Sequence, residues 1–124
     1  MSRSSATVNS SRSAELLLEK ARAKLKLGQH RLAQGYVTRA FDLNPFLEGP
    51  EYPIRAFAGK LKVMRGQVEE GLADLNFACK TAPDQAYLFA WRGETLRRLG
   101  RADEAKRDIV KALKLDPKHA VAWV

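Results

Sequence analysis

The chain has 124 residues, enough for one domain with a modest core, and it is 45% hydrophobic and 29% charged, as soluble globular proteins are. No apolar run approaches the roughly 20 residues that a membrane-spanning helix needs, and residues 1–13 lack the apolar middle region of a secretory signal. The formal net charge of +8 is spread along the chain. The charge therefore favours acidic partners and indicates no dedicated nucleic-acid-binding tail.

Side chains that carry chemistry are sparse. The single cysteine, Cys79, excludes an internal disulfide and a multi-cysteine metal site, and the two histidines are His30 and His119. Both histidines fall in expected turns, and no catalytic triad or glycine-rich phosphate loop is recognisable. We therefore expect no enzymatic activity, no cofactor and no metal site. One unpaired cysteine favours a reducing, cytoplasmic location.

The first 13 residues are rich in serine, contain arginine and lack acidic residues. Their low hydrophobicity leaves little surface to bury on folding. We therefore predict that residues 1–13 form a disordered tail and that the folded domain covers residues 14–124.

Three segments of the folded part share one pattern: "LGQHRLAQGYVTRAFDLNP", "RGQVEEGLADLNFACKTAP" and "LGRADEAKRDIVKALKLDP". Each has glycine at its second place, small residues five and twelve places later, and proline at its end. The glycines are Gly28, Gly66 and Gly100, which are 38 and 34 residues apart. The chain therefore contains an internal repeat.

Each repeat is predicted to form two helices. Upstream of each glycine lies a helical pattern of 13 or 14 residues, such as "AYLFAWRGETLRRL", in which Phe89, Gly93 and Leu96 share one face. Glycine ends this helix because a left-handed backbone costs little without a β-carbon. A second helix follows within two residues, and the closing proline stops it.

This pattern resembles the tetratricopeptide repeat, a 34-residue helix–turn–helix unit. The resemblance covers units 14–45, 52–83 and 84–117, and residues 118–124 resemble the start of a fourth. The second unit departs most, because Arg55 replaces a large apolar residue and Gly71 replaces alanine. The resemblance implies an all-α fold, a right-handed α-solenoid of stacked antiparallel helix pairs.

In this family the first helix of each unit forms a concave wall that receives an extended peptide or a partner helix. Helical spacing selects the side chains that point to this wall. They are Leu18, Arg22, Lys26, Phe57, Lys60, Met64, Tyr87, Trp91, Glu94 and Arg98. We predict a non-catalytic protein–protein interaction scaffold whose partner carries apolar and acidic residues. Packing between neighbouring units is the alternative role for the large side chains, and a solvated face is the alternative for the basic ones.

Some co-chaperones of this family hold the C-terminal carboxylate of Hsp70 or Hsp90 with a clamp of Lys, Asn, Asn, Lys and Arg. The matching positions here hold Leu18, Arg22, Phe57, Tyr87 and Trp91. None of them is the residue that the clamp requires. We therefore expect a ligand other than the Hsp70 or Hsp90 tail.

Other functions stay open at this point. Because "HAVAWV" at residues 119–124 would begin a fourth unit, the chain also fits the N-terminal regulatory or assembly segment of a larger enzyme, such as a glycosyltransferase or sulfotransferase. A small secretion chaperone and a nucleic-acid-associated adaptor are the remaining alternatives. Poor coverage of Ile109, Leu113 and Trp123 also predicts a homodimer through the C-terminal end.

Overall fold

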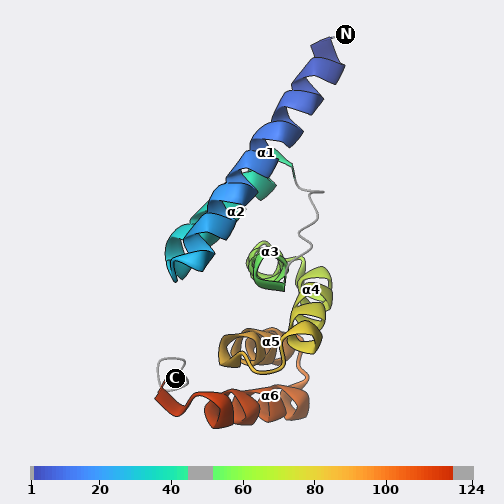
Figure 1. Cartoon of the computed structure of the whole chain (residues 1–124). Helices are drawn as coiled ribbons and strands as arrows, with labels where there is room; N and C mark the ends of the chain where they lie inside the picture. The colour runs from blue at the N-terminus through green and yellow to red at the C-terminus, as the bar shows by residue number, and fades with distance from the viewer. Residues whose placement is uncertain (1, 45–51, 119–124) are drawn as a thin grey trace. The chain divides into compact units, whose positions relative to one another are not determined.

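The computed structural model describes residues 2–44 and 52–118, which contain six α-helices and no strand (Figure 1). Helix α1 spans Ser2–Lys26, α2 spans His30–Leu43, α3 spans Tyr52–Met64, α4 spans Val68–Thr81, α5 spans Ala86–Arg98 and α6 spans Ala102–Leu115. The prediction of an all-α fold is confirmed. Apart from Lys118, the expected start of a fourth unit lies outside the described residues.

The chain divides into two compact units, residues 1–58 and residues 59–124, with the boundary inside α3. In the first unit α1 packs against α2. In the second, α4 packs against α5 and α5 packs against α6. The contacts between α1 and α2 and between α5 and α6 join the two helices expected within the repeats at 14–45 and 84–117.

Residues 2–13 differ from the sequence expectation, because they are helical and form the first half of α1. No glycine or proline occurs between residues 2 and 26, so no backbone feature stops the helix of the first repeat from extending toward the N-terminus. Among the side chains described from Arg12 onward, burial begins at Ala14 and continues at Leu18 and Ala21. Ala14, the first residue expected in the first repeat, is therefore part of the buried face of α1.

Glycine ends α1, α3 and α5 with one geometry. Gly28, Gly66 and Gly100 have φ angles of 74°, 90° and 78°, in the left-handed region. The residue after each glycine donates its amide to the carbonyl five positions earlier, as Arg101 does to Leu96 at 2.9 Å, and each glycine donates to the carbonyl three positions earlier. This pair of hydrogen bonds is the Schellman motif. The prediction of glycine C-caps is confirmed.

The face that α5 turns toward α6 is the predicted one. Phe89 and Leu96 are each 4% exposed, and a β-carbon placed at Gly93 would lie 3.0 Å from the Cδ1 atom of Ile109 and 3.2 Å from the carbonyl oxygen of Ala105. The two helices therefore approach more closely at Gly93 than an alanine would comfortably allow. Gly93 therefore lets α5 pack closely against α6.

Glycine replaces the alanine of the repeat pattern at position 71 for a steric reason. A β-carbon at this position of α4 would lie 2.5 Å from the carbonyl oxygen of Gly59 and 2.5 Å from the Cγ2 atom of Val63, both on α3. A β-carbon at Gly59 would in turn lie 2.9 Å from the carbonyl oxygen of Gly71. These distances are shorter than van der Waals contact, so two glycines facing each other let α3 and α4 cross backbone to backbone.

Candidate functional site

Five of the predicted wall residues line one hollow in the second compact unit. Lys60 and Met64 come from the end of α3, and Trp91, Glu94 and Arg98 come from α5. The hollow has a volume of about 70 Å³. Because α3 and α5 are the first helices of successive repeats, this hollow lies where the family resemblance places the binding wall.

Trp91 joins two other predicted wall residues through its ring. The Nζ atom of Lys60 lies 4.4 Å from the centroid of the Trp91 ring, which is a cation–π contact. The Tyr87 ring meets the Trp91 ring edge-on, with centroids 5.0 Å apart and an angle of 75° between the planes. The hollow therefore presents an aromatic surface and a positive charge side by side.

The Lys60 ammonium is partly withdrawn from water, and desolvation by burial lowers its pKa from the usual value. Within residues 2–44 and 52–118, its recorded contact is the Trp91 ring, and no carboxylate forms an ion pair with it. A partly desolvated charge gains more from a carboxylate than a fully hydrated one does. Lys60 is therefore placed to receive an acidic group from a ligand.

The negative charge of Glu94 is already matched. Its carboxylate accepts hydrogen bonds from Nη2 of Arg97 at 2.6 Å and from Nε of Arg97 at 2.9 Å, and Nε of Arg98 lies 3.5 Å away. The hydrogen bonds from Arg97 lower the pKa of Glu94, which keeps it ionised at neutral pH. Since Arg97 and Arg98 neutralise Glu94, the positive charge of Lys60 stays unmatched at the hollow.

The other predicted wall residues lie elsewhere. Leu18 and Phe57 are each 3% exposed, so they are core residues and offer almost no surface to a ligand. Arg22 is half-buried and Lys26 is exposed on α1. All four belong to the first compact unit, whereas the hollow belongs to the second.

Three further residues complete the lining: Val63, which directly precedes Met64 on α3, and Leu75 and Thr95, which the sequence prediction missed. These last two are not on the predicted line of first-helix residues. Both are buried, and the Thr95 hydroxyl donates to the carbonyl oxygen of Trp91 at 2.9 Å. Thr95 lies four residues after Trp91 on α5, so helical spacing could have found it. Leu75 comes from α4, the second helix of its repeat. The wall residues were predicted from the first helices alone, so this prediction does not include Leu75.

In the described ranges, no group of three or more His, Cys, Asp or Glu side chains could hold a metal ion. None of the helices described there is both long enough and apolar enough to cross a membrane. The enzyme, cofactor and metal expectations made from the sequence stay predictions.

Cys79 is buried, and desolvation by burial raises its pKa to about 11. Because the thiolate is the reacting form, we expect alkylation of Cys79 by iodoacetamide at pH 8 to be about 100-fold slower in the native protein than in the unfolded one. The raised pKa favours the protonated thiol in the folded state. Its contribution to stability is therefore fully present below the ordinary thiol pKa and is lost as the pH rises through 11.

Mass spectrometry of the alkylated protein, with and without guanidinium, measures both rates. Equal rates in the native and unfolded states would show that Cys79 is open to solvent.

Consecutive antiparallel helix pairs, in which a Schellman glycine ends the first helix of each pair, define an α-helical repeat protein. Residues 86–119 match a family model described as "Tetratricopeptide repeat". Residues 86–119 are therefore a tetratricopeptide repeat, which confirms the resemblance inferred from the sequence for the third unit. A search of curated proteins gave no match.

Solved structures of tetratricopeptide (TPR) domains are similar to this chain. The second TPR domain of the human RPAP3 protein, in complex with an HSP70 peptide, is 24% identical, with 94% of this chain and 93% of that chain covered and a TM-score of 0.57. The TPR domain of Arabidopsis OM64 is 23% identical, with coverages of 92% and 93% and a TM-score of 0.59. YrrB, a TPR protein with an unusual peptide-binding site, is 24% identical, with coverages of 89% and 56% and a TM-score of 0.59. At these identities the likeness establishes the fold alone, which is all-α and of the tetratricopeptide type.

Proposed function

We propose that the chain is a non-catalytic scaffold that binds a peptide or a partner helix at the hollow between α3 and α5. The supporting observation is the Lys60 ammonium 4.4 Å from the centroid of the Trp91 ring. An apolar side chain of the ligand covers Trp91, and a neighbouring carboxylate of the ligand pairs with Lys60. Tryptophan is among the residues that most often dominate the energy of protein interfaces.

The ligands of two similar structures support this chemistry. A TPR domain of human RPAP3 is in complex with the HSP70 peptide SGPTIEEVD, and the second TPR of Spaghetti (RPAP3) is bound to the HSP90 peptide SRMEEVD. Both peptides combine acidic residues with valine near their ends. A ligand that combines acidic and apolar residues therefore has precedent in this fold.

The ligand itself is proposed to differ from those tails. The five clamp positions hold three aromatic residues, one leucine and one arginine: Phe57, Tyr87, Trp91, Leu18 and Arg22. Two of them, Leu18 and Phe57, are buried. A terminal carboxylate therefore lacks the donors of a two-carboxylate clamp, and the proposed ligand binds through Trp91 and Lys60.

The test uses Trp91 as its own reporter. The chain has two tryptophans, so Trp123→Phe leaves Trp91 as the single source of tryptophan fluorescence. Peptides that pair leucine or phenylalanine with glutamate and carry a fluorescent label are titrated into the protein, and the anisotropy of the label gives the affinity of every variant, including the one without Trp91. We expect Trp91→Ala and Lys60→Glu each to weaken binding by about 10-fold or more, because they remove the apolar surface and reverse the charge.

Lys80→Glu is the matched control, because it makes the same charge change at an exposed position of α4 outside the hollow. Its effect is expected to stay within about threefold. Unchanged affinity in both Trp91→Ala and Lys60→Glu would remove the hollow from consideration. Tighter binding of SRMEEVD than of the other peptides would show that the clamp is not needed for a chaperone tail.

A further inference from the structure

The sulfur atoms of the described residues differ in their access to solvent. Within residues 2–44 and 52–118, the sulfur-containing side chains are those of Met64 and Cys79. Met64 is the last residue of α3 and is 65% exposed, whereas Cys79 is 3% exposed within α4. A dissolved oxidant therefore reaches the thioether of Met64 more readily than the thiol of Cys79.

The two side chains also differ in reactivity. A cysteine reacts with peroxides as its thiolate, and burial raises the pKa of Cys79 to about 11, so its thiolate is scarce at pH 7. A methionine thioether has no ionisable proton, and its oxidation depends mainly on its exposure. We therefore expect mild peroxide treatment at pH 7 to oxidise Met64 before Cys79.

Met64 belongs to the apolar part of the hollow at Trp91. Two other aliphatic residues line this hollow, but Val63 is 7% exposed and Leu75 is 0% exposed. The apolar surface that a ligand can reach there therefore comes mainly from Met64 and from the half-buried Trp91 ring. Lys60 lies four residues before Met64, one turn away on the same side of α3. A chemical change at Met64 thus occurs beside both groups that the proposed ligand uses.

We propose that Met64 is a site of reversible oxidation by peroxides, and that its sulfoxide weakens the binding of the apolar and acidic ligand at the hollow. The effect on affinity rests on the proposed function, because it concerns the same site. The thioether sulfur takes one oxygen atom from hydrogen peroxide, the O–O bond breaks, and water is released. The sulfur is oxidised by two electrons and the peroxide is reduced by two. A sulfoxide reductase that consumes two thiols reverses the step and forms water and a disulfide.

The added oxygen atom lowers the affinity for two reasons. It is polar, so it loses its hydration when the apolar side chain of a ligand covers Met64. It is also a hydrogen-bond acceptor one turn from the Lys60 ammonium, where it competes with the carboxylate of the ligand. In the unbound protein Met64 is exposed, so the oxygen stays hydrated and the stability of the fold is unchanged.

The first measurement locates the oxidation. The full chain is treated with hydrogen peroxide at pH 7, and peptide mapping by mass spectrometry follows the gain of oxygen at each sulfur. We expect Met64 to be oxidised at a rate within about threefold of its rate in the unfolded chain, and ahead of Cys79. A native rate at Met64 more than about 10-fold below the unfolded rate, or oxidation of Cys79 first, would overturn the assignment of the site.

The second measurement compares affinities. The unoxidised and the oxidised protein are titrated with the same labelled peptides that test the proposed function. We expect oxidation to weaken binding by about 10-fold, because the buried polar oxygen lacks a partner in an apolar side chain. Treatment with reductases for both sulfoxide epimers and dithiothreitol is expected to restore the original affinity. An oxidised protein that binds as tightly as the unoxidised one would contradict the proposal.

Two variants separate the chemistry of Met64 from its packing. Met64→Leu keeps an apolar side chain of similar volume, so its affinity is expected to stay within about twofold and to become insensitive to peroxide. This variant retains Met1 and so controls for oxidation there. Met64→Gln introduces a polar side chain and is expected to weaken binding by about 10-fold without peroxide. If Met64→Leu loses as much affinity in peroxide as the unchanged protein does, the effect arises at another residue and the proposal is wrong.

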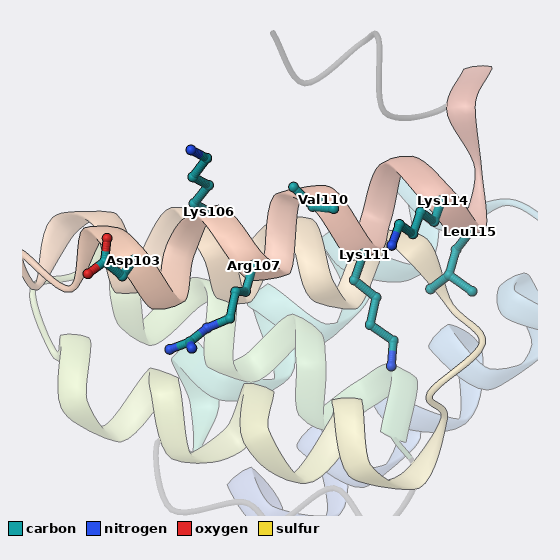
Figure 2. A pocket seen from close by; sticks show the side chains of 7 residues that line it. All are labelled: Asp103, Lys106, Arg107, Val110, Lys111, Lys114 and Leu115. Carbon is teal, nitrogen blue, oxygen red and sulfur yellow. The ribbon is translucent and has the colours of Figure 1, made fainter.

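Leu115→Gln is the matched control for Met64→Gln. Leu115 is the last residue of α6, as Met64 is of α3, and it is 39% exposed. It lines a separate hollow on α6, which shares no residue with the hollow at Trp91 (Figure 2). The affinity of Leu115→Gln is expected to stay within about twofold of the unchanged protein. Equal losses in the two glutamine variants would show that the position of Met64 in the hollow is not the cause.

The effect of oxidation and the proposed function can fail separately. Binding that oxidation leaves unchanged would overturn the role of Met64 alone. No binding of the peptides by the unoxidised protein would overturn the proposed function and, with it, the effect of oxidation on affinity.

Discussion

Gly71→Ala is expected to lower the free energy of unfolding of the second compact unit by about 2 to 3 kcal/mol, the range of overpacking substitutions in a close-packed interior. The added β-carbon would lie 2.5 Å from the carbonyl oxygen of Gly59. A carbonyl oxygen belongs to the backbone and cannot rotate away, so α3 and α4 must move apart. That movement opens gaps among the buried neighbours of the crossing, including Leu75. Urea unfolding followed by far-UV circular dichroism measures the loss.

Gly35→Ala is the matched control for this substitution. Gly35 lies within α2, is exposed, and has no atom within 4 Å of a built β-carbon. Alanine has the higher helix propensity, so this variant is expected to gain about 0.5 to 1 kcal/mol. The same substitution should thus destabilise at the helix crossing and stabilise on the surface. Equal effects at the two positions would show that the close approach of Gly59 and Gly71 does not limit stability.

The local parts of this fold could be predicted from the sequence because they depend on neighbours along the chain. The left-handed backbone at Gly28, Gly66 and Gly100 follows from glycine's missing β-carbon. The inward face of Phe89 and Leu96 follows from helical spacing. The site was predicted in part for the same reason, because spacing shows which residues of α3 and α5 turn away from their second helices.

Spacing could not show what lies opposite a side chain. It placed Leu18 and Phe57 on the wall in the same way as Lys60, yet the first two are buried. Whether a predicted wall residue is exposed to a partner or packed against a neighbouring helix depends on contacts between helices. The sequence pattern of one repeat does not specify these contacts. Residues 2–13 show a similar limit, because low hydrophobicity predicts that a segment does not pack but does not exclude that it is helical.

An aspartate that recurs at one place in the aligned repeats could also have predicted two buried ion pairs. Asp74 and Asp108 both lie eight residues after a repeat glycine and are buried at 7% and 6% exposure. The Asp74 carboxylate pairs with Nζ of Lys62 at 2.8 Å, and Asp108 pairs with Arg92. A carboxylate repeated at one place on the inner side of a second helix therefore indicates an ion pair with the first helix. In the first repeat the corresponding residue is Tyr36, and the Nζ atom of Lys20 lies 6.0 Å from its ring centroid.

Breaking the ion pair between Arg92 and Asp108 is the second change for which we expect a large loss of stability. The guanidinium donates from Nε and from Nη2 to the two carboxylate oxygens, each at 2.7 Å, and this pairing raises the pKa of Arg92. The Asp108 side chain is 8% exposed and the Arg92 side chain 24% exposed. Arg92→Met would leave a buried carboxylate without its partner. We expect the free energy of unfolding to fall by about 2 to 4 kcal/mol, because the desolvation of Asp108 is then uncompensated.

Two further variants separate the cost of the orphaned charge from the value of the pair. Arg92→Met/Asp108→Leu removes both charges and is expected to recover most of the stability, because an apolar pair of similar volume avoids the desolvation penalty. Arg101→Met breaks a pair of similar length, 2.6 Å to Glu104, whose side chains are 46% and 42% exposed. It is expected to cost less than about 1 kcal/mol. Denaturant unfolding of the three variants measures their free energies of unfolding. The comparison shows whether burial or the length of an ion pair sets its contribution to stability. If Arg101→Met costs as much as Arg92→Met, then the length of an ion pair, and not its burial between α5 and α6, sets its contribution here.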